Sequence, residues 1–296
     1  MGYTSVDDLF QSVTVDGKVL RVPFTKTIYT GATSAAGRWH ELLSQVGTGG
    51  QMTLTGTAGA GIACTSATAG ALPIGANVET AETRHLLSMM VNTPATTLTP
   101  ANLILTDIIH IYPSCVLVTT PTTLTNHPTW TGTGDTRMSN AKGVQASVFL
   151  TTASSAAGQL TLTYLDQDGN SQAQTGSIYG PGSATPAGCC LNQTGVTATP
   201  GAVNIALANG DYGVQRVSSY TINSGVTGGV GCIILHRPIA SIPIIAANTP
   251  AERDFTTGPL TLPRIYDGAC LGMFVQIGGA LTAGNNISGE LVMGWS

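Results

Sequence analysis

The stretch QLTLTYLDQDGNSQAQTGSI, residues 159–178, decides the fold class. Leu160, Leu162 and Tyr164 alternate with threonines, which is the two-residue period of a strand that buries one face. The run DQDGN that follows is rich in turn-forming residues, and a second polar and small-residue run continues after it. The stretch therefore predicts a β-hairpin.

Similar runs surround this hairpin in the sequence. GVQASVFLTT (143–152) places Val144, Ala146, Val148 and Leu150 on one face of a predicted strand. Further strands are predicted in NLILTDIIHIYPSCVLVTT (102–120), VNIALANGDYGVQRVSSYTIN (203–223, a hairpin turning at Asn209-Gly210), GGVGCIILHRP (228–238) and the last 28 residues, read as two strands around a Gly/Asn loop. Many short strands without an internal repeat predict a mainly β fold with a β-sandwich or jelly-roll-like body.

The first hundred residues differ in style from the rest. Residues 1–50 are interpreted as an extended N-terminal arm with a short helix, 51–102 as a Gly/Ala/Thr-rich region of loops and short strands, and 103–296 as the β body. Ser5 is a predicted N-cap for a helix through VDDLFQSV. A second helix is predicted over SAAGRWHELLSQV, because its large apolar residues recur at helical spacing, while LLSMMVN suits either a helix or a strand.

Charge is scarce throughout the chain. Charged residues make up 9% of the sequence, against roughly 25% in ordinary globular domains, while 42% is hydrophobic and the formal net charge is −4. No basic run exists, so a nucleic-acid partner is not expected, and no apolar run or leader suggests a membrane partner. A surface so poor in charge indicates a protein whose flanks are covered by other subunits.

The six cysteines show no metal-binding or redox spacing. Most stand in apolar runs such as VGCIIL, so they are interpreted as small buried residues, with Cys189 and Cys190 expected to be the most exposed. DQDGN matches only a fragment of a calcium loop, and the glycine-rich runs fail the phosphate-binding spacings. No metal, no cofactor and no catalytic residue is predicted, and the five histidines stand in unrelated settings. The chain is therefore not expected to be an enzyme.

One charged cluster, Arg38-Trp39-His40-Glu41, interrupts the neutral segment 30–76. Arg38 and Glu41 can pair at helical spacing, and Trp and Arg are frequent interface anchors. The four residues are interpreted as a packing or subunit-interface site.

The segment TGATSAAGRWHELLSQVGTG (30–49) is similar to a G-R-W-H-[DE]-L stretch of tailed-bacteriophage head-region proteins, and the low-charge, β-rich remainder resembles such virion proteins in composition. The resemblance implies a capsid-associated decoration or cement protein. It would be located on the virion head after synthesis in the host cytoplasm, and would contact copies of itself, as a trimer, and other capsid proteins. Two alternatives stay open: the major capsid shell subunit, and a receptor- or glycan-binding virion protein.

Overall fold

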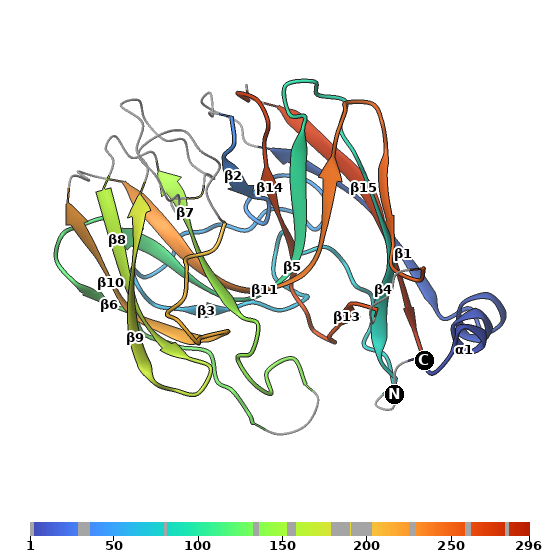
Figure 1. Ribbon diagram of the computed structural model, residues 1–296, viewed down its shortest axis with the longest axis horizontal. Helices are drawn as coiled ribbons and strands as arrows, with labels where there is room; N and C mark the ends of the chain where they lie inside the picture. Colours follow the sequence, from blue (N-terminus) through green and yellow to red (C-terminus); the bar gives the residue numbers. More distant parts are fainter. Residues whose placement is uncertain are drawn as a thin grey trace.

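The computed structural model describes residues 3–28, 36–79, 82–132, 136–152, 158–178, 190, 203–224, 229–257, 262–281 and 284–296. The strands of this part of the chain form three antiparallel sheets (Figure 1). The predicted mainly β class is confirmed, and the N-terminal helix is also confirmed. It comprises α1 (Val6–Phe10) and a π-helical turn (Gln11–Val15), and the Ser5 hydroxyl accepts a 3.0 Å hydrogen bond from the Asp8 amide.

The first outer sheet, on the right in Figure 1, has the strand order β1-β15-β4-β12, with β13 also paired to β4. Its strands are β1 (Val19–Ile28), β15 (Asn285–Trp295), β4 (Arg84–Asn92), β12 (Ala251–Asp254) and β13 (Arg264–Ile265). The second outer sheet, on the left, has the order β6-β10-β8-β9. Its strands are β6 (Thr122–Thr123), β10 (Val214–Ser224), β8 (Gly158–Asp166) and β9 (Ser171–Ile178). The predicted hairpin at residues 159–178 is confirmed as β8 and β9.

The central sheet lies between the two outer sheets and has the order β2-β14-β5-β11-β7, with β3 also paired to β5. Its strands are β2 (Trp39–Glu41), β14 (Leu271–Gln276), β5 (Ala101–Val116), β11 (Val230–Ile244), β7 (Gln145–Thr152) and β3 (Ile62–Ala63). β5 and β11 are 16 and 15 residues long. At about 3.3 Å per residue each is roughly 50 Å long, which lets it pack against both outer sheets.

The two long strands serve two separate cores in turn. Leu103 and Leu105 of β5 belong to a first hydrophobic cluster shared with the first outer sheet, whereas Ile109 and Tyr112 further along belong to a second cluster shared with the second outer sheet. Ile108, which lies between them in the sequence, belongs to a third cluster. Residues of the segment 39–71 cover this cluster. Because β5 is buried on both faces, its sequence does not alternate between apolar and polar residues.

The three segments expected from the sequence (1–50, 51–102 and 103–296) do not correspond to the three sheets. β1 pairs along its whole length with β15, from Val19 opposite Gly294 to Ile28 opposite Asn285, and β2 lies at the edge of the central sheet beside β14. The first fifty residues therefore supply strands to two sheets of the body. The two C-terminal strands expected around the Gly/Asn loop lie in different sheets. β14 belongs to the central sheet and β15 to the first outer sheet.

Candidate functional site

Arg38-Trp39-His40-Glu41 is not helical, so the helix predicted over this segment is wrong where the structure describes it. Trp39, His40 and Glu41 form β2 and pair with Gln276, Val275 and Phe274 of β14. The Cys190 amide donates to the Trp39 carbonyl oxygen at 2.8 Å. Backbone pairing in the central sheet has outweighed the local helical spacing of the apolar side chains.

All four side chains of this cluster are buried within one chain: their exposed fractions are 3% for Arg38, 6% for Trp39, 1% for His40 and 0% for Glu41. The Glu41 carboxylate accepts hydrogen bonds from the amide and hydroxyl of Ser44. Burial raises the pKa of Glu41. Burial and the nearby Arg38 cation lower the pKa of His40 to about 3. The cluster packs inside the protomer, and a role in contacts between subunits stays a prediction.

Lys26 of β1 lies close to this cluster and is itself buried, with 1% of its surface exposed. Its Nζ donates to three backbone carbonyl oxygens, those of Gln45 at 3.3 Å, Gly50 at 3.1 Å and Gly70 at 2.9 Å. Burial lowers the pKa of Lys26 to about 8, although the Glu41 carboxylate acts in the opposite direction. The amine therefore joins two stretches of the neutral segment to the first outer sheet.

Glycine is required where these stretches meet. A Cβ on Gly49 would lie 1.8 Å from the Ala71 carbonyl oxygen, and one on Gly70 would lie 2.0 Å from the Leu43 carbonyl oxygen. Both residues also have positive φ angles, +80° and +88°. The glycines of the neutral segment thus permit close backbone packing around Lys26.

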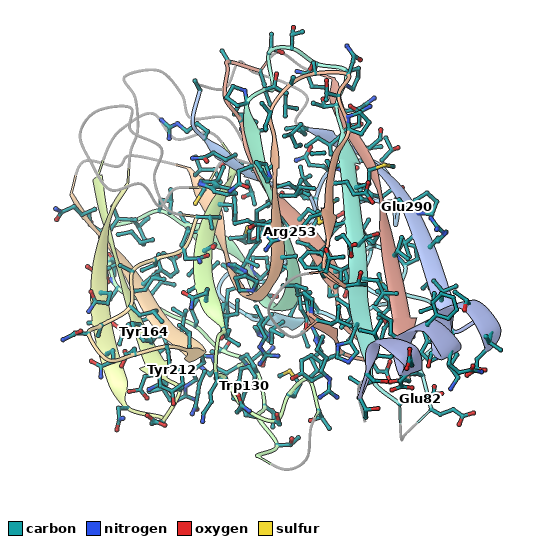
Figure 2. The ribbon with its side chains drawn as sticks, turned by 45° about the vertical axis from the view of Figure 1, so that its right-hand side comes forward. Glu82, Trp130, Tyr164, Tyr212, Arg253 and Glu290 are labelled. Carbon is teal, nitrogen blue, oxygen red and sulfur yellow. The ribbon has the colours of Figure 1, made fainter. Side chains whose placement is uncertain are left out.

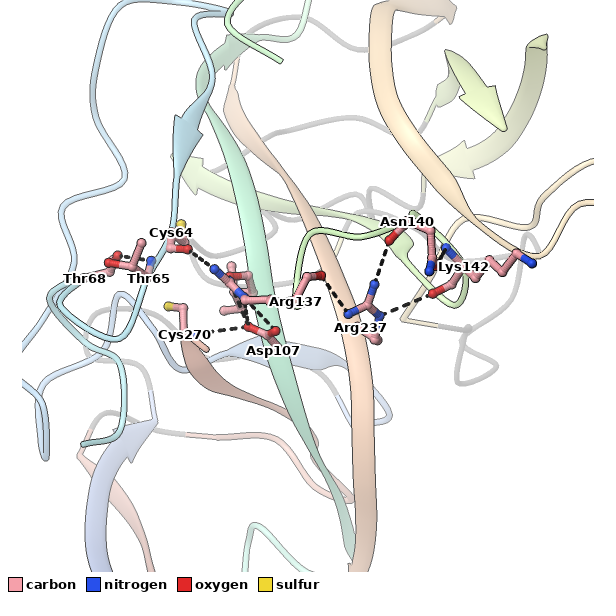
Figure 3. Close-up of polar contacts among 10 residues, drawn as sticks. Cys64, Thr65, Thr68, Asp107, Arg137, Asn140, Lys142, Arg237 and Cys270 are labelled. Atoms are coloured by element: carbon pink, nitrogen blue, oxygen red, sulfur yellow. Dashed lines mark hydrogen bonds and ion pairs between the residues drawn. The ribbon is translucent and has the colours of Figure 1, made fainter. Parts of the chain in front are cut away.

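Asp107 and Arg137 form a buried ion pair on the central sheet (Figure 3). Arg137 Nε lies 2.8 Å from Asp107 Oδ2, and Arg137 Nη2 lies 2.8 Å from Oδ1. The Asp107 carboxylate also accepts a 3.0 Å hydrogen bond from the Cys270 amide, and Arg137 Nη1 donates to the Cys64 carbonyl oxygen at 2.7 Å. One ion pair therefore fixes the backbone at both Cys64 and Cys270.

Arg237 of β11 extends the network, as Figure 3 shows. Its guanidinium donates to the carbonyl oxygens of Arg137 at 3.3 Å, Asn140 at 3.0 Å and Lys142 at 3.3 Å. The ring of Tyr266 lies 5.6 Å from its Cζ. Arg237 thus holds the loop that carries Arg137 against the central sheet.

His236 has hydrogen bonds of the kind that a catalytic base makes. Its Nε2 lies 2.9 Å from the Ser147 hydroxyl and 2.9 Å from the Asn204 Oδ1, and its Nδ1 lies 2.8 Å from the Thr106 hydroxyl. His236 and Ser147 each have 0% of their surface exposed, and burial lowers the pKa of His236 to about 3. A neutral, fully enclosed imidazole of this kind joins strands together and gives a substrate no access.

The Asp166 carboxylate accepts hydrogen bonds from other residues of the turn between β8 and β9. Asp166 Oδ1 accepts hydrogen bonds from the amides of Asp168 and Asn170, both at 2.8 Å, and Oδ2 accepts one from the Asn170 side chain at 3.0 Å. The hairpin interpretation of DQDGN is confirmed. Among the described residues, no three His, Cys, Asp or Glu side chains are grouped to hold a metal ion.

Two open pockets lie on the described surface. One, of about 390 Å³, is lined mainly by small residues and backbone near Gly37 and Pro100. The other, of about 330 Å³, contains the Lys18–Glu82 ion pair, with its Nζ and Oε1 atoms 2.7 Å apart, and Arg84 beside Trp295. Neither pocket is lined by a histidine, a cysteine or a serine.

Five cysteines are free and buried, as the sequence predicts: Cys64, Cys115, Cys190, Cys232 and Cys270. The expectation that Cys190 is exposed is wrong. Its backbone forms an isolated antiparallel bridge with Phe149 of β7, and 0% of its surface is exposed. Cys189 lies outside the described residues.

The surface carries few ionic groups, and several charged side chains are hidden inside. Of the 11 Lys and Arg and 15 Asp and Glu residues of the sequence, six are buried among those that the structure describes: Lys26, Arg38, Glu41, Arg84, Asp107 and Asp166. Figure 2 marks charged side chains of the first outer sheet and its edge, including Glu290 and Arg253. Large apolar side chains also reach the surface, among them Val6 at 78% exposed, Phe10 at 65% and Ile245 at 78%. No helix in the described ranges is long and apolar enough to cross a membrane.

Comparisons with known proteins give little. No protein-family model matches the chain, and no curated protein matches it. Among solved structures, the chain is similar to a chain of the infectious bursal disease virus Gt strain, with 10% identity, 94% of this chain and 80% of that chain covered, and a TM-score of 0.18. It is also similar to the VP2 subviral particle of infectious bursal disease virus, with 7% identity, 97% and 85% covered, and a TM-score of 0.17. Structural similarity at such low TM-scores supports no conclusion about fold or function.

The sequence reasoning missed Lys26 and the pair Asp107–Arg137, although a signal existed for two of them. Lys26 stands at an inward position of a strand whose other inward residues include Val22, Phe24 and Ile28. Asp107 interrupts an apolar run. A charged residue at a position that the pattern assigns to the core indicates a buried polar contact, but the pattern does not identify its partner.

Proposed function

We propose that the protein is a non-enzymatic virion structural protein: a capsid-associated decoration or cement subunit that stabilises the head through contacts between subunits. The observation that carries this proposal is the neutral surface. Six charged side chains of an already charge-poor chain are buried, so the surface has fewer ionic groups than the composition alone implies. Mutual repulsion between copies is correspondingly weak, which favours association.

The surface area sets the scale of such contacts. The accessible surface of one chain is 12191 Å², close to the roughly 11,700 Å² expected for a compact monomer of this mass. A standard protein–protein contact covers about 800 Å² on each partner. Each subunit of a trimer would therefore cover only a small part of its surface, and more would remain for contacts with other capsid proteins.

The interior supports a structural role over a catalytic one. The histidine and hydroxyl groups that could form a nucleophile and base are enclosed in the central sheet, and their contacts join strands. Buried ion pairs and carbonyl contacts likewise join segments far apart in the sequence. A protein that bears load between neighbours needs such internal connections.

The first test is the mass of the purified full chain in solution, measured by light scattering over a range of concentrations. We expect a trimer, with three times the chain mass of 30.2 kDa. A monomer that stays dispersed at high concentration, with its neutral surface in water, would contradict the proposal.

The second test compares virions with and without the protein. Particles that lack it should lose their contents at lower temperature, while equal heat resistance would contradict the cementing role. Copy number separates the two capsid roles, because the most abundant protein of the particle by gel densitometry would be the shell subunit and not a decoration protein.

A further inference from the structure

Cys64 and Cys270 lie end to end along one edge of β5. The Cys64 amide donates to the Ile109 carbonyl oxygen at 3.1 Å, and the Cys270 carbonyl oxygen accepts from the Ile108 amide at 2.8 Å. Cys64 follows β3 directly and Cys270 precedes β14 directly. The two cysteines therefore face consecutive residues of β5, although 205 residues separate them in the sequence.

The two thiols lie in one hydrophobic cluster. Both residues belong to the third hydrophobic cluster, and Cys270 is near enough to raise the pKa of the Cys64 thiol. Their exposed fractions are 1% and 0%, and both are free. Figure 3 shows the two sulfur atoms on the same side of β5, next to the Asp107–Arg137 pair.

The ion pair holds the backbone of both cysteines. Arg137 Nη1 donates to the Cys64 carbonyl oxygen at 2.7 Å, and the Cys270 amide donates to Asp107 Oδ1 at 3.0 Å. Asp107 and Arg137 are in turn joined through two guanidinium nitrogens. The separation of the two cysteines is thus fixed by contacts that do not involve their sulfur atoms.

We propose that Cys64 and Cys270 are a disulfide-forming pair, which a low-molecular-weight disulfide oxidises in the folded protein. The thiolate of one cysteine attacks a sulfur of the reagent, forms a mixed disulfide and releases one reagent thiolate. The second cysteine, as thiolate, attacks the protein sulfur of that mixed disulfide and releases the other reagent thiolate. The protein loses two protons and two electrons, and the reagent is reduced to two thiols.

The environment makes this reaction slow. The neighbouring Cys270 thiol and burial raise the pKa of Cys64 well above its usual value, so little thiolate is present. Access also depends on transient opening of the segment that covers the third cluster. We therefore expect a reaction over hours, after which the bond is equally protected from reductants.

The bond would connect the neutral segment to the central sheet across a long loop. Closing a loop of this length restricts the unfolded chain, so the thermal midpoint should rise, on the order of 5–10 °C. Since this inference concerns the chain alone, it does not depend on the virion role.

The experiment incubates the folded full chain with 2-hydroxyethyl disulfide at pH 8.5, about 10 °C below its thermal midpoint, and samples it over a day. Remaining thiols are alkylated in denaturant, and the protein is analysed by intact mass and by peptide mapping. We expect two thiols to be lost, a peptide that links Cys64 to Cys270, and a raised thermal midpoint. Full alkylation after a day, or linkage of any other pair, would overturn the proposal.

Variants separate this pair from general thiol chemistry. C64S and C270S should each abolish the rise in thermal midpoint, and C115S should keep it. Cys115 is the matched control because it is also buried, but in the second cluster, where its thiol donates to the Tyr112 carbonyl oxygen at 3.3 Å. If a serine variant fails to fold, the peptide map of the unaltered protein still decides. A Cys64–Cys270 bond that lowers the midpoint would show that the backbone is not positioned for it.

Discussion

Arg137 and Asp107 depend on each other because neither charge has bulk water to solvate it. The Asp107 side chain is 2% exposed and that of Arg137 is 10% exposed. Removing one partner leaves the other as an uncompensated buried charge, whereas an exposed ion pair contributes little. Side chains of this kind determine stability one residue at a time.

Replacing Arg137 by Met should therefore lower the free energy of unfolding by about 3–5 kcal/mol. Urea denaturation followed by circular dichroism measures the change. Arg253→Met is the matched control, since the Arg253 guanidinium donates to the Ser241 carbonyl oxygen on the exposed face of β12. Similar losses for the two variants would show that Asp107 is solvated after all.

Acid should destabilise the protein through His236. Its pKa is lowered to about 3 in the folded state and is about 6.5 in the unfolded chain, so the unfolded state binds more protons below pH 6.5. The stability is complete above pH 6.5 and falls as the pH is lowered toward 3, by about 2–3 kcal/mol at pH 4.5 from this residue.

His236→Gln should remove this part of the pH dependence, which unfolding curves between pH 4.5 and 7.5 would measure. His127→Gln is the control, because His127 is only partly buried and accepts or donates a single hydrogen bond with the Tyr112 hydroxyl. An unchanged slope in the His236 variant would mean that the imidazole is not held neutral.

At the scale of elements, the neutral segment is organised by close backbone contacts. Its glycines allow residues 43–50 and 70–71 to approach one another around the Lys26 amine. Few large side chains are needed where backbone packs on backbone, which explains the Gly/Ala/Thr composition without disorder.

Gly49 and Gly50 offer a matched pair for testing this packing. Both have positive φ angles, +80° and +82°, but a Cβ would meet the Ala71 carbonyl oxygen at 1.8 Å only on Gly49. Gly50→Ala should cost about 1–2 kcal/mol from backbone strain alone, and Gly49→Ala should cost clearly more. Thermal unfolding of the two variants gives the comparison, and equal losses would contradict the close approach.

At the scale of the whole molecule, two sandwiches share the long strands β5 and β11. Each outer sheet packs against these strands, since Leu105 lies in the first cluster and Tyr112 in the second. We therefore expect the two halves to unfold together.

Leu291→Ala in the first cluster and Leu162→Ala in the second test this coupling, because both side chains are almost fully buried at 0% and 1% exposed. Each variant should lose about 2–5 kcal/mol and keep a single calorimetric transition. The appearance of two separate transitions in either variant would show that the sandwiches unfold independently.

The sequence by itself determined the mainly β class, the β8–β9 hairpin, the inward face of β7 and the Ser5-capped helix. These features depend on neighbours a few residues apart, through side-chain alternation, turn chemistry and capping. The strand at Trp39–Glu41 was mistaken for a helix for the same reason, because its spacing is local while its pairing with β14 is not.

Only the tertiary structure decided which strands share a sheet, which charges meet in the interior and which cysteines share a cluster. β14 and β15 are consecutive yet lie in different sheets, Lys26 reaches the Gly70 carbonyl oxygen, and Cys64 and Cys270 lie in one cluster. Each of these contacts joins residues that no local pattern relates, because their proximity follows from burying three hydrophobic clusters around one central sheet.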